Sequence, residues 1–305
     1  MEQLYDVVII GAGPGGLTAG IYTGRAGLKT LLLEKGFAGG QMMTTYLIEN
    51  YPGFPDGISG MELTSLMQKQ VEKLGIPITN LEITKIAPQD DRSFILHHSE
   101  GEIRTRAMII ASGAQARLLG VPGEDRLKGR GVSYCATCDG AFFKNEHLIV
   151  AGGGNSAIEE AGYLTHFASQ VTVVHRRHQL RAEKMIQEKA FKNPKINFIW
   201  DSVITEISGT QQVESVQIKN VKSGETSRID AGGVFVFVGM NPNTNFLNNL
   251  IPLDEDGFII TDEKMATGIP GIYAAGDVRS KDVRQIASAV GDGAIAGVMV
   301  EKYLE

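Results

Sequence analysis

The stretch YDVVIIGAGPGGLTAG, residues 5–20, decides the fold of this 305-residue chain. A short apolar run, residues 5–10, ends in the spacing Gly-x-Gly-x-x-Gly, and a helical stretch follows to about Arg25. A second apolar run, residues 30–33, ends at Glu34. In this pattern a strand, a crossover helix and a parallel strand follow one another, and the glycines let the backbone and the helix N-terminus approach a pyrophosphate. The stretch therefore predicts a dinucleotide-binding unit.

The same pattern occurs again later in the chain. Residues 147–151 form another apolar run, a second glycine-rich spacing starts at Gly152, and residues 171–174 lead to His175. The separation from the first glycine to the residue at the strand end is the same in both copies, 11 to 34 and 152 to 175. The chain therefore contains a diverged internal repeat of two nucleotide-binding units.

Each copy is followed by alternating segments that are typical of a small antiparallel meander. These segments are residues 78–86, 93–97 and 102–105 after the first copy, and residues 196–207, 213–219 and 226–229 after the second. Each meander leads into a further apolar strand that ends in glycine, at residues 108–113 and 234–239. A strand at 272–277 and a Gly- and Ala-rich helix from about 285 to 302 have no counterpart in the repeat.

The sequence thus predicts an α/β protein with two Rossmann-like dinucleotide-binding domains, each with three layers in a ββα arrangement. Residues 1–115 and 245–305 are expected to form the first domain. Residues 118–242 are expected to form the second, which is inserted into the first through linkers at 120–123 and 241–243.

Composition and charge exclude several classes of function. The net charge is −6 and the chain has no block of roughly five like charges, so nucleic acids and anionic membranes are not expected partners. The N-terminus runs into the first strand without the pattern of a signal peptide, and no apolar run reaches the roughly 18 residues of a membrane-spanning helix. A cytoplasmic protein is therefore expected.

The two nucleotide sites differ at the end of their second strand. Glu34 can accept hydrogen bonds from the hydroxyls of a ribose with a free 2′-OH, unless it is only a solvated acid. The second copy instead has His175, Arg176 and Arg177, followed by Arg181. Guanidinium groups bind phosphate in a bidentate manner, so this site is predicted to prefer NADPH to NADH. A solvated basic strand end is the alternative.

The only cysteines of the chain, Cys135 and Cys138, lie between the two fingerprints. A lone C-x-x-C indicates a redox-active dithiol, although a structural disulfide is an alternative that a reducing compartment disfavours. A zinc site would need two more ligands at suitable spacing, so no metal is expected. A hydride donor and a dithiol need an adapter, for which a flavin is usual. The first unit is therefore expected to hold FAD, with Asp277 near its ribityl or pyrophosphate part.

Together these residues resemble the low-molecular-weight thioredoxin reductases. The motifs that carry the resemblance are CATCDG at 135–140, GGGNSA at 152–157, HRRHQLR at 175–181, GGQM at 39–42, ENYPG at 49–53, GD at 276–277 and RQIA at 284–287. The similarity runs nearly end to end. Gly162, in the helix after the second fingerprint, departs from the larger apolar residue that is usual there.

The resemblance implies a thioredoxin-disulfide reductase in which electrons pass from NADPH to FAD, then to the Cys135–Cys138 disulfide and to oxidised thioredoxin. It implies that Cys138 lies next to the flavin and that Cys135 attacks thioredoxin. Asp139 becomes the acid–base group, unless it is a helix-cap or turn aspartate. A homodimer and a rotation of the domains between the half-reactions are also implied.

The resemblance also assigns the cofactor-binding residues. Those expected to contact FAD are Gly11, Gly13, Pro14, Gly15, Gly16, Glu34, Lys35, Gly39, Gly40, Gln41, Asn50, Gly113, Gly276, Asp277, Arg284, Gln285, Ile286 and Ala287. Those expected to contact NADPH are Gly152, Gly154, Asn155, Ser156, Ala157, His175, Arg176, Arg177 and Arg181. Two other functions stay open, a flavin reductase that serves another small dithiol protein and a nucleotide-binding redox sensor.

Overall fold

The computed structural model describes residues 4–45 and 47–305. The chain divides into two compact units, Met1–Gln115 with Asn241–Glu305, and Ala116–Met240. The second unit is therefore an insertion in the first. The chain passes from one unit to the other twice, in β7 (Ala114–Ala116) and in β16 (Met240–Pro242). These two strands pair with each other in a two-stranded sheet.

In the described part of the first unit, a seven-stranded sheet has the order β3-β2-β1-β6-β5-β4, with β17 paired to β6. The strand bounds are β1 Leu4–Ile10, β2 Thr30–Glu34, β3 Ile78–Asn80, β4 Ile83–Pro88, β5 Phe94–His98, β6 Gly101–Ile110 and β17 Ile272–Ala274. Strand β1 pairs in parallel with both β2 and β6. The helix α1, Pro14–Arg25, connects β1 to β2, which confirms the α/β fold class predicted from the first fingerprint.

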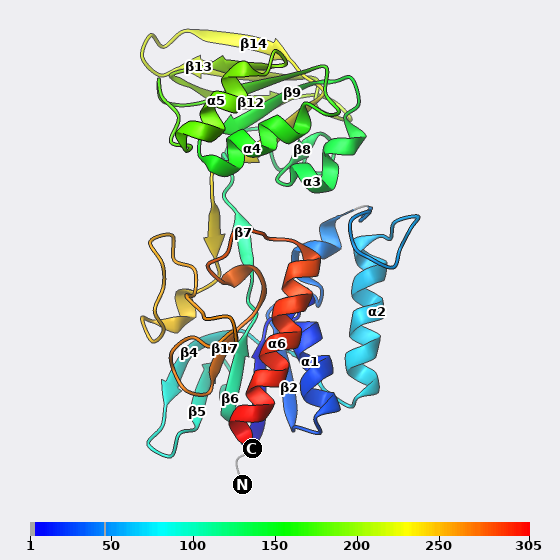
Figure 1. Ribbon diagram of the computed structural model, residues 1–305, viewed down its shortest axis with the longest axis vertical. Coiled ribbons are helices and arrows are strands. Elements are labelled where there is room, and N and C mark those ends of the chain that lie inside the picture. Colours follow the sequence, from blue (N-terminus) through cyan, green and yellow to red (C-terminus); the bar gives the residue numbers. More distant parts are fainter. Residues whose placement is uncertain (1–3, 46) are drawn as a thin grey trace. The chain divides into compact units, whose positions relative to one another are not determined.

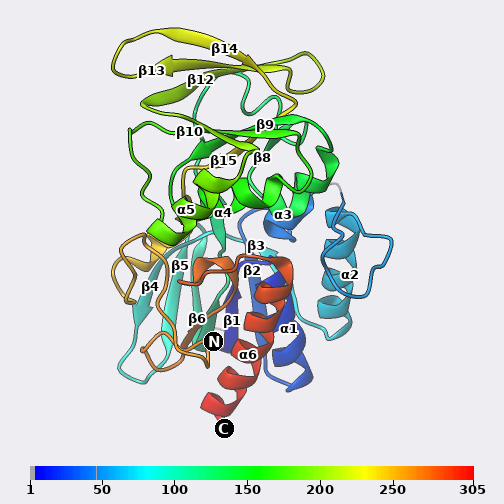
Figure 2. The same ribbon diagram turned by 45° about the horizontal axis from the view of Figure 1, so that its top comes forward.

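Helices cover one face of this sheet. They are α1, α2 (Gly60–Lys73) and α6 (Ile286–Leu304), and α6 runs beside α1 in both ribbon views (Figures 1 and 2). Val7 and Ile9 of β1 are buried among residues of these helices, whereas Val8 and Ile10 are buried on the other face with residues of β4 and β5 and of the segment 247–259. Successive side chains of a strand point to opposite faces, so a strand covered on both sides is apolar throughout.

The contact between α1 and α6 is close because both helices carry glycine there. A Cβ atom on Gly293 would collide with the carbonyl oxygen of Gly15, and one on Gly297 would collide with the side chain of Tyr22. The sequence leaves open whether this C-terminal helix belongs to the core or to a dimer interface. Since Ala296 is fully buried among core residues of the first unit, the helix is part of that core.

The first meander differs from the prediction in one respect. The sequence predicts separate strands at residues 102–105 and 108–113, whereas the structure has the single long strand β6, Gly101–Ile110. Its first half pairs antiparallel with β5, and its second half pairs in parallel with β17. Arg104 and Arg106 break the apolar pattern within this strand, but their side chains reach solvent and pair with Asp91 and Asp6. The polar interruption therefore does not end the strand.

The second unit has three layers. Its five-stranded sheet, in the order β11-β10-β9-β15-β8, lies between a layer with helices and a three-stranded antiparallel sheet, β12-β13-β14 (Figure 2). The strand bounds are β8 Val132–Ser133, β9 His147–Gly152, β10 Gln170–Val174, β11 Ile196–Ile199, β12 Ser202–Ser208, β13 Ser215–Asn220, β14 Thr226–Asp230 and β15 Gly233–Phe237. The helices are α3 Ala136–Asp139, α4 Asn155–Leu164 and α5 Lys184–Lys192.

Alternate residues of β9 face the two outer layers, since Leu148 packs toward the helices and Ile149 toward the small sheet. Residues 196–207, which the sequence predicts as one strand, form two strands because Asp201 between them has a left-handed backbone with φ 50°. Short 3₁₀ turns complete the described structure, η1 Gly40–Thr44, η2 Gly140–Phe142, η3 Asn245–Leu247 and η4 Gly276–Val278. Among the residues that the structure describes, no helix has the length and apolarity needed to cross a membrane.

Candidate functional site

The loop between β1 and α1 forms a cradle of backbone groups. Gly11 has φ +106°, and a Cβ atom there would collide with the carbonyl oxygen of Ala111. A Cβ atom on Gly16 would collide with the carbonyl oxygen of Gly11. In contrast, nothing lies within 4 Å of the corresponding position on Gly13, and α1 begins there without a side-chain cap. The first N–H groups of α1 are therefore open to a phosphate.

Glu34, at the end of β2, is anchored beside this loop. Its Oε2 accepts a hydrogen bond from the N–H of Ala12 at 2.8 Å, and its Oε1 accepts one from the N–H of Gly36 at 3.2 Å. Gly39 donates its N–H to the carbonyl of Ala12 at 2.7 Å. Each carboxylate oxygen keeps a lone pair for a ribose hydroxyl, as the predicted role requires. Lys35 instead forms an exposed ion pair with Glu82 on the surface.

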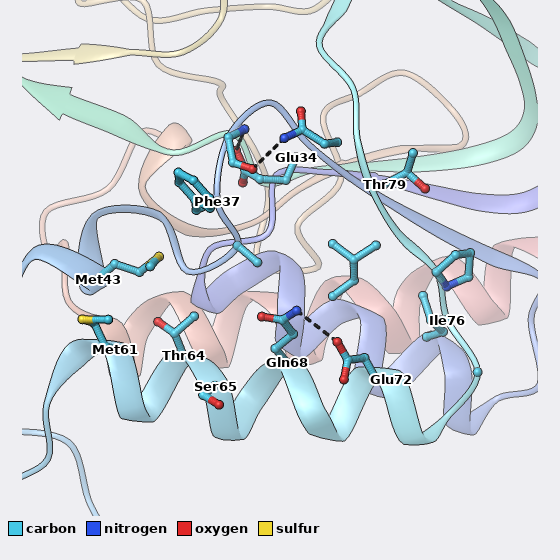
Figure 3. A pocket seen from close by; sticks show the side chains of 16 residues that line it. Glu34, Phe37, Met43, Met61, Thr64, Ser65, Gln68, Glu72, Ile76 and Thr79 are labelled. Atoms are coloured by element: carbon cyan, nitrogen blue, oxygen red, sulfur yellow. Dashed lines mark hydrogen bonds between the residues drawn. The ribbon is translucent and has the colours of Figure 1, made fainter.

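A hollow of about 580 Å³ opens beside Glu34, between the loop after β2 and helix α2 (Figure 3). Phe37, in the loop after β2, lies at this hollow and is 85% exposed. On the opposite side, Gln68 of α2 donates a hydrogen bond to Glu72 of the same helix. The lining residues include Glu34 and Glu72 but no Lys, Arg or His. The hollow is therefore unsuited to phosphate, and an anionic part of a ligand belongs at the helix N-terminus instead.

Asp277, in the turn after β17, lies next to a buried group of charges that no sequence pattern indicated. Asp292 on α6 accepts the N–H of Gly276 at 3.0 Å and forms ion pairs with Arg279 at 2.7 Å and Lys281 at 3.0 Å. Lys281 Nζ also lies 3.4 Å from Oδ1 of Asp277. Burial raises the pKa of Asp277, and the Lys281 ammonium acts against this rise. These charges fix the turn that presents Asp277.

Two buried polar atoms of this region have no hydrogen-bond partner within the described ranges, Nε of Arg284 and Oδ1 of Asp277, and the second of these has the 3.4 Å ion pair with Lys281. The Arg284 guanidinium lies 4.1 Å from the ring centroid of Phe258. The neighbouring Gln285 accepts a hydrogen bond from Asn50 at 3.1 Å. Buried polar groups without a protein partner usually have one in a ligand or water. Together with the open helix N-terminus, these atoms fit a flavin dinucleotide.

The other residues predicted to contact FAD lie at the same loops and helix starts. A Cβ on Gly15 would lie 3.4 Å from the backbone nitrogen of Gly276, and one on Gly40 would lie 3.4 Å from Cα of Gly13. The structure therefore brings together these three segments, which are far apart in the sequence. The remaining predicted residues are Pro14 at the start of α1, Gln41 in η1, Gly113 after β6, and Ile286 and Ala287 at the start of α6.

The second fingerprint forms a similar cradle between β9 and α4. Gly152 has φ +152°, and a Cβ atom there would collide with the carbonyl oxygen of Phe237. At Gly154 the one atom within 4 Å of a Cβ position is Nη2 of Arg181, at 3.9 Å. Helix α4 begins after Gly154 without a side-chain cap. Its first N–H groups, which include those of Ser156 and the buried Ala157, are therefore available to a phosphate.

His175 lies beneath this loop instead of facing solvent. Its side chain is buried, Nε2 bonds to the carbonyl oxygen of Gln179 at 3.1 Å, and a Cβ atom on Gly153 would collide with its ring. Burial lowers the pKa of His175, which favours the neutral imidazole. We therefore expect His175 to support the glycine loop from below. The neighbouring Arg176 and Arg177 are exposed and accessible to a ligand.

Arg176, Arg177 and Arg181 line a hollow of about 360 Å³. Backbone bonds tie this segment to the glycine loop, because the N–H of Arg181 donates to the carbonyl of Gly153 at 2.8 Å. Asn155 bonds to the backbone N–H of Glu183 at 2.8 Å and so holds the start of α5 close to α4. The hollow lies beyond the carboxyl ends of β10 and β11, where open parallel sheets bind nucleotides.

Cys135 and Cys138 form a disulfide at the start of α3, with their Cα atoms 5.3 Å apart. Cys135 is the N-cap of this short helix, and its Sγ accepts a hydrogen bond from the N–H of Cys138 at 3.2 Å. After reduction the same N–H would stabilise a thiolate on Cys135. Over residues 4–45 and 47–305, no three His, Cys, Asp or Glu side chains gather closely enough to hold a metal ion.

Asp139 is connected to the cysteine loop through Ser133, a residue that no sequence signal indicated. The Ser133 hydroxyl donates to Oδ2 of Asp139 at 2.6 Å and accepts the N–H of Cys135 at 3.1 Å. Burial raises the pKa of Asp139, and the hydrogen bond from Ser133 acts in the opposite direction. The carboxyl group therefore keeps its proton to a higher pH than an exposed aspartate and can act as an acid.

Comparisons with known proteins agree with this chemistry. The family model described as pyridine nucleotide-disulphide oxidoreductase matches residues 5–293. A thioredoxin reductase from Listeria innocua is 48% identical, over 100% of this chain and 95% of that protein. The thioredoxin reductase from Bacillus subtilis is 47% identical, over 100% of this chain and 96% of its own length.

Two solved structures extend the comparison to the fold. The crystal structure of thioredoxin reductase from Streptococcus pyogenes MGAS5005 has a TM-score of 0.93 at 51% identity, covering 100% of this chain and 99% of that one. The crystal structure of Lactococcus lactis thioredoxin reductase in its FR conformation has a TM-score of 0.69, also at 51% identity. The match covers 98% of this chain and 99% of that one. From the family match over nearly its whole length and these relatives, this chain belongs to the pyridine nucleotide-disulphide oxidoreductase family.

Proposed function

We propose that this protein is a thioredoxin-disulfide reductase that draws electrons from NADPH through FAD. The observation that carries the proposal is the disulfide Cys135–Cys138 on the unit that also has the arginine-lined nucleotide hollow. The flavin cradle of the first unit and the relatives named thioredoxin reductase support it.

The residues of the first unit would hold FAD, which supplies a redox centre between a two-electron hydride donor and a disulfide. Glu34 would accept the ribose hydroxyls, and the N-terminus of α1 would face the pyrophosphate. Nε of Arg284 and Oδ1 of Asp277, which is paired with Lys281 at 3.4 Å, would face the cofactor. In the second unit, Arg176 and Arg181 would bind the 2′-phosphate of NADPH.

The thiol chemistry follows from the cysteine loop. Reduction of the Cys135–Cys138 bond takes up two electrons and two protons and gives two thiols. The Cys135 thiolate then attacks the disulfide of thioredoxin, and one thioredoxin sulfur leaves as a thiol. Cys138 attacks the mixed disulfide, which releases reduced thioredoxin and restores the Cys135–Cys138 bond. Asp139 would supply the proton to the leaving thiolate.

We also infer that the two units change their orientation between the half-reactions. The dithiol belongs to the second unit and the flavin cradle to the first, while thioredoxin must reach the same cysteines. The two solved relatives support this, because at equal identity their TM-scores are 0.93 and 0.69. Rigid units in different arrangements lower a whole-chain superposition without any change in sequence identity.

A covalent crosslink between the two units tests the rotation. We expect the locked protein to carry out one of the two half-reactions in a single turnover, but to lose steady-state turnover. Stopped-flow absorbance would follow the half-reaction, and a reducible crosslinker provides the control, since its cleavage should restore turnover. Full turnover in the locked protein would contradict the rotation.

Steady-state assays with a panel of small redox proteins test the proposed function. We expect rapid NADPH oxidation with thioredoxin, a lower kcat/KM with glutaredoxin-like and peroxiredoxin-linked proteins, and a kcat/KM for NADPH at least about 10-fold above that for NADH, since charged hydrogen bonds to the 2′-phosphate are lost with NADH. A preference for another dithiol protein would favour the alternative reductase. Absence of turnover with every partner would favour the redox sensor. The homodimer and the cytoplasmic location stay predictions.

A further inference from the structure

A lysine from a distant turn lies at the arginine-lined hollow of the second unit. Lys222, in the turn between β13 and β14, lines this hollow together with Asp201, which follows β11. Lys222 Nζ lies 2.9 Å from Oδ2 of Asp201. The Lys222 side chain is 64% exposed, whereas that of Asp201 is 17% exposed. The ammonium group is therefore held at the edge of the hollow and still faces solvent.

The backbone connects this turn to the arginine segment. Val221 donates its N–H to the carbonyl of Asp201 at 2.7 Å, and Asp201 donates its own N–H to the carbonyl of Arg177 at 3.3 Å. Asn220 closes the turn, because its side-chain oxygen accepts the N–H of Lys222 at 2.9 Å. The position of Lys222 thus depends on hydrogen bonds that run to the arginines, and a lysine on a free surface loop would have no such restraint.

The charges at the hollow are unbalanced. Arg176, Arg177, Arg181 and Lys222 bring four positive charges, and Asp201 brings one negative charge. Within the described parts of the chain, none of the three guanidinium groups has an ion-pair partner. Mutual repulsion among these cations is relieved when a dianionic group enters the hollow. A phosphate monoester matches this requirement in charge and size.

We propose that Lys222 is a further specificity-determining residue, which contributes a fourth cation to the binding of a 2′-phosphorylated adenine nucleotide. The inference rests on the proposed use of NADPH but assigns a residue outside the arginine motif. Asp201 holds the ammonium at the hollow and partly neutralises it while no phosphate is bound. A phosphate then competes with this carboxylate for the same ammonium group.

Binding of nucleotide fragments to the complete flavoprotein tests this role without any turnover. Calorimetry with both fragments gives the contribution of the 2′-phosphate as the ratio of the Kd for 5′-AMP to the Kd for 2′,5′-ADP. In Lys222→Gln we expect a weakening of about fivefold for 2′,5′-ADP, because one partly solvated charge pair is lost, and no change for 5′-AMP. Lys222→Arg should keep the wild-type ratio, and higher salt should reduce the difference between the wild type and Lys222→Gln.

Two further variants make the result decisive. Lys219→Gln removes the same charge from an exposed position on β13 outside the hollow, and the ratio should stay unchanged. The double variant Arg176→Gln, Arg181→Gln should lower the ratio more than Lys222→Gln does. If the arginine variant loses discrimination while Lys222→Gln keeps the wild-type ratio, the role of Lys222 is overturned and the NADPH preference stands. If the wild-type protein binds 2′,5′-ADP and 5′-AMP equally, the role of Lys222 and the NADPH preference are both overturned.

Discussion

Cys135→Ser is expected to abolish the reduction of thioredoxin completely. The variant cannot form the Cys135–Cys138 disulfide, and it lacks the sulfur whose thiolate is stabilised by the N–H of Cys138. The flavin cradle lies in the other unit and should be unaffected. The measurement is thioredoxin-dependent oxidation of NADPH. The control is NADPH oxidation by a dye that accepts electrons without a thiol, which should continue in the variant.

The matched variant Cys138→Ser separates the roles of the two cysteines. It keeps the Cys135 thiol but lacks the sulfur that resolves the mixed disulfide. We therefore expect a covalent adduct with thioredoxin that accumulates on a non-reducing gel, whereas Cys135→Ser should give none. The opposite pattern would exchange the roles of Cys135 and Cys138. Thioredoxin reduction at the wild-type rate in Cys135→Ser would contradict the proposed function.

Asp139→Asn is expected to lower kcat with thioredoxin by about 100-fold, the lower range for loss of a general acid. The amide has nearly the same shape and can still accept the hydrogen bond from Ser133, but it cannot supply a proton. In the wild type, the rate should fall as the pH rises through the raised pKa of Asp139. The pH profile of the variant should lack this limb. The measurement is kcat as a function of pH for both proteins.

Stability provides the control for Asp139→Asn. Because the pKa of Asp139 is raised in the folded state, its contribution to stability is present below the unfolded pKa and is lost as the pH rises through the folded one. Removing the ionisable group should therefore not lower the Tm at neutral pH. A large fall in kcat with an unchanged Tm supports the acid role. An unchanged kcat would mean that Asp139 serves only as a turn residue.

The two nucleotide cradles could be predicted because their geometry demands glycine. Gly11 and Gly152 have positive φ, and a side chain at either position would collide with a backbone carbonyl, that of Ala111 after β6 or that of Phe237 in β15. Gly13 faces open space in front of a helix N-terminus, and a Cβ on the corresponding Gly154 would have only the guanidinium of Arg181 near it, at 3.9 Å. Because the backbone geometry at these positions requires glycine, the pattern can be recognised in a single sequence.

Helix α2 was not predicted, although its signals are present. Ser59 accepts the N–H of Glu62, as a helix N-cap does, and Leu63, Met67 and Val71 recur at four-residue spacing and are buried. Such a pattern is weaker than a glycine fingerprint, because serine and acidic residues also occur in loops.

The residues that support the sites could not be predicted, for a different reason. Ser133 reaches Asp139 through a local fold of the cysteine loop, and Asp292 reaches Gly276 through the docking of α6. Lys222 lies at the hollow because backbone bonds pass through Asp201. These roles depend on tertiary contacts between segments whose own sequences carry no motif.

The packing of α6 on α1 has a consequence for synthesis on the ribosome. The carbonyl of Gly15, within the first fingerprint, lies against Gly293 of α6, which is translated only after the whole inserted unit. The inserted unit, Ala116–Met240, has emerged in full well before that helix exists. The inserted unit can therefore fold before all segments of the first unit have been made. Helix α1 lacks its α6 neighbour until α6 leaves the exit tunnel, so termination of translation before α6 would leave the flavin cradle incomplete and spare the dithiol unit.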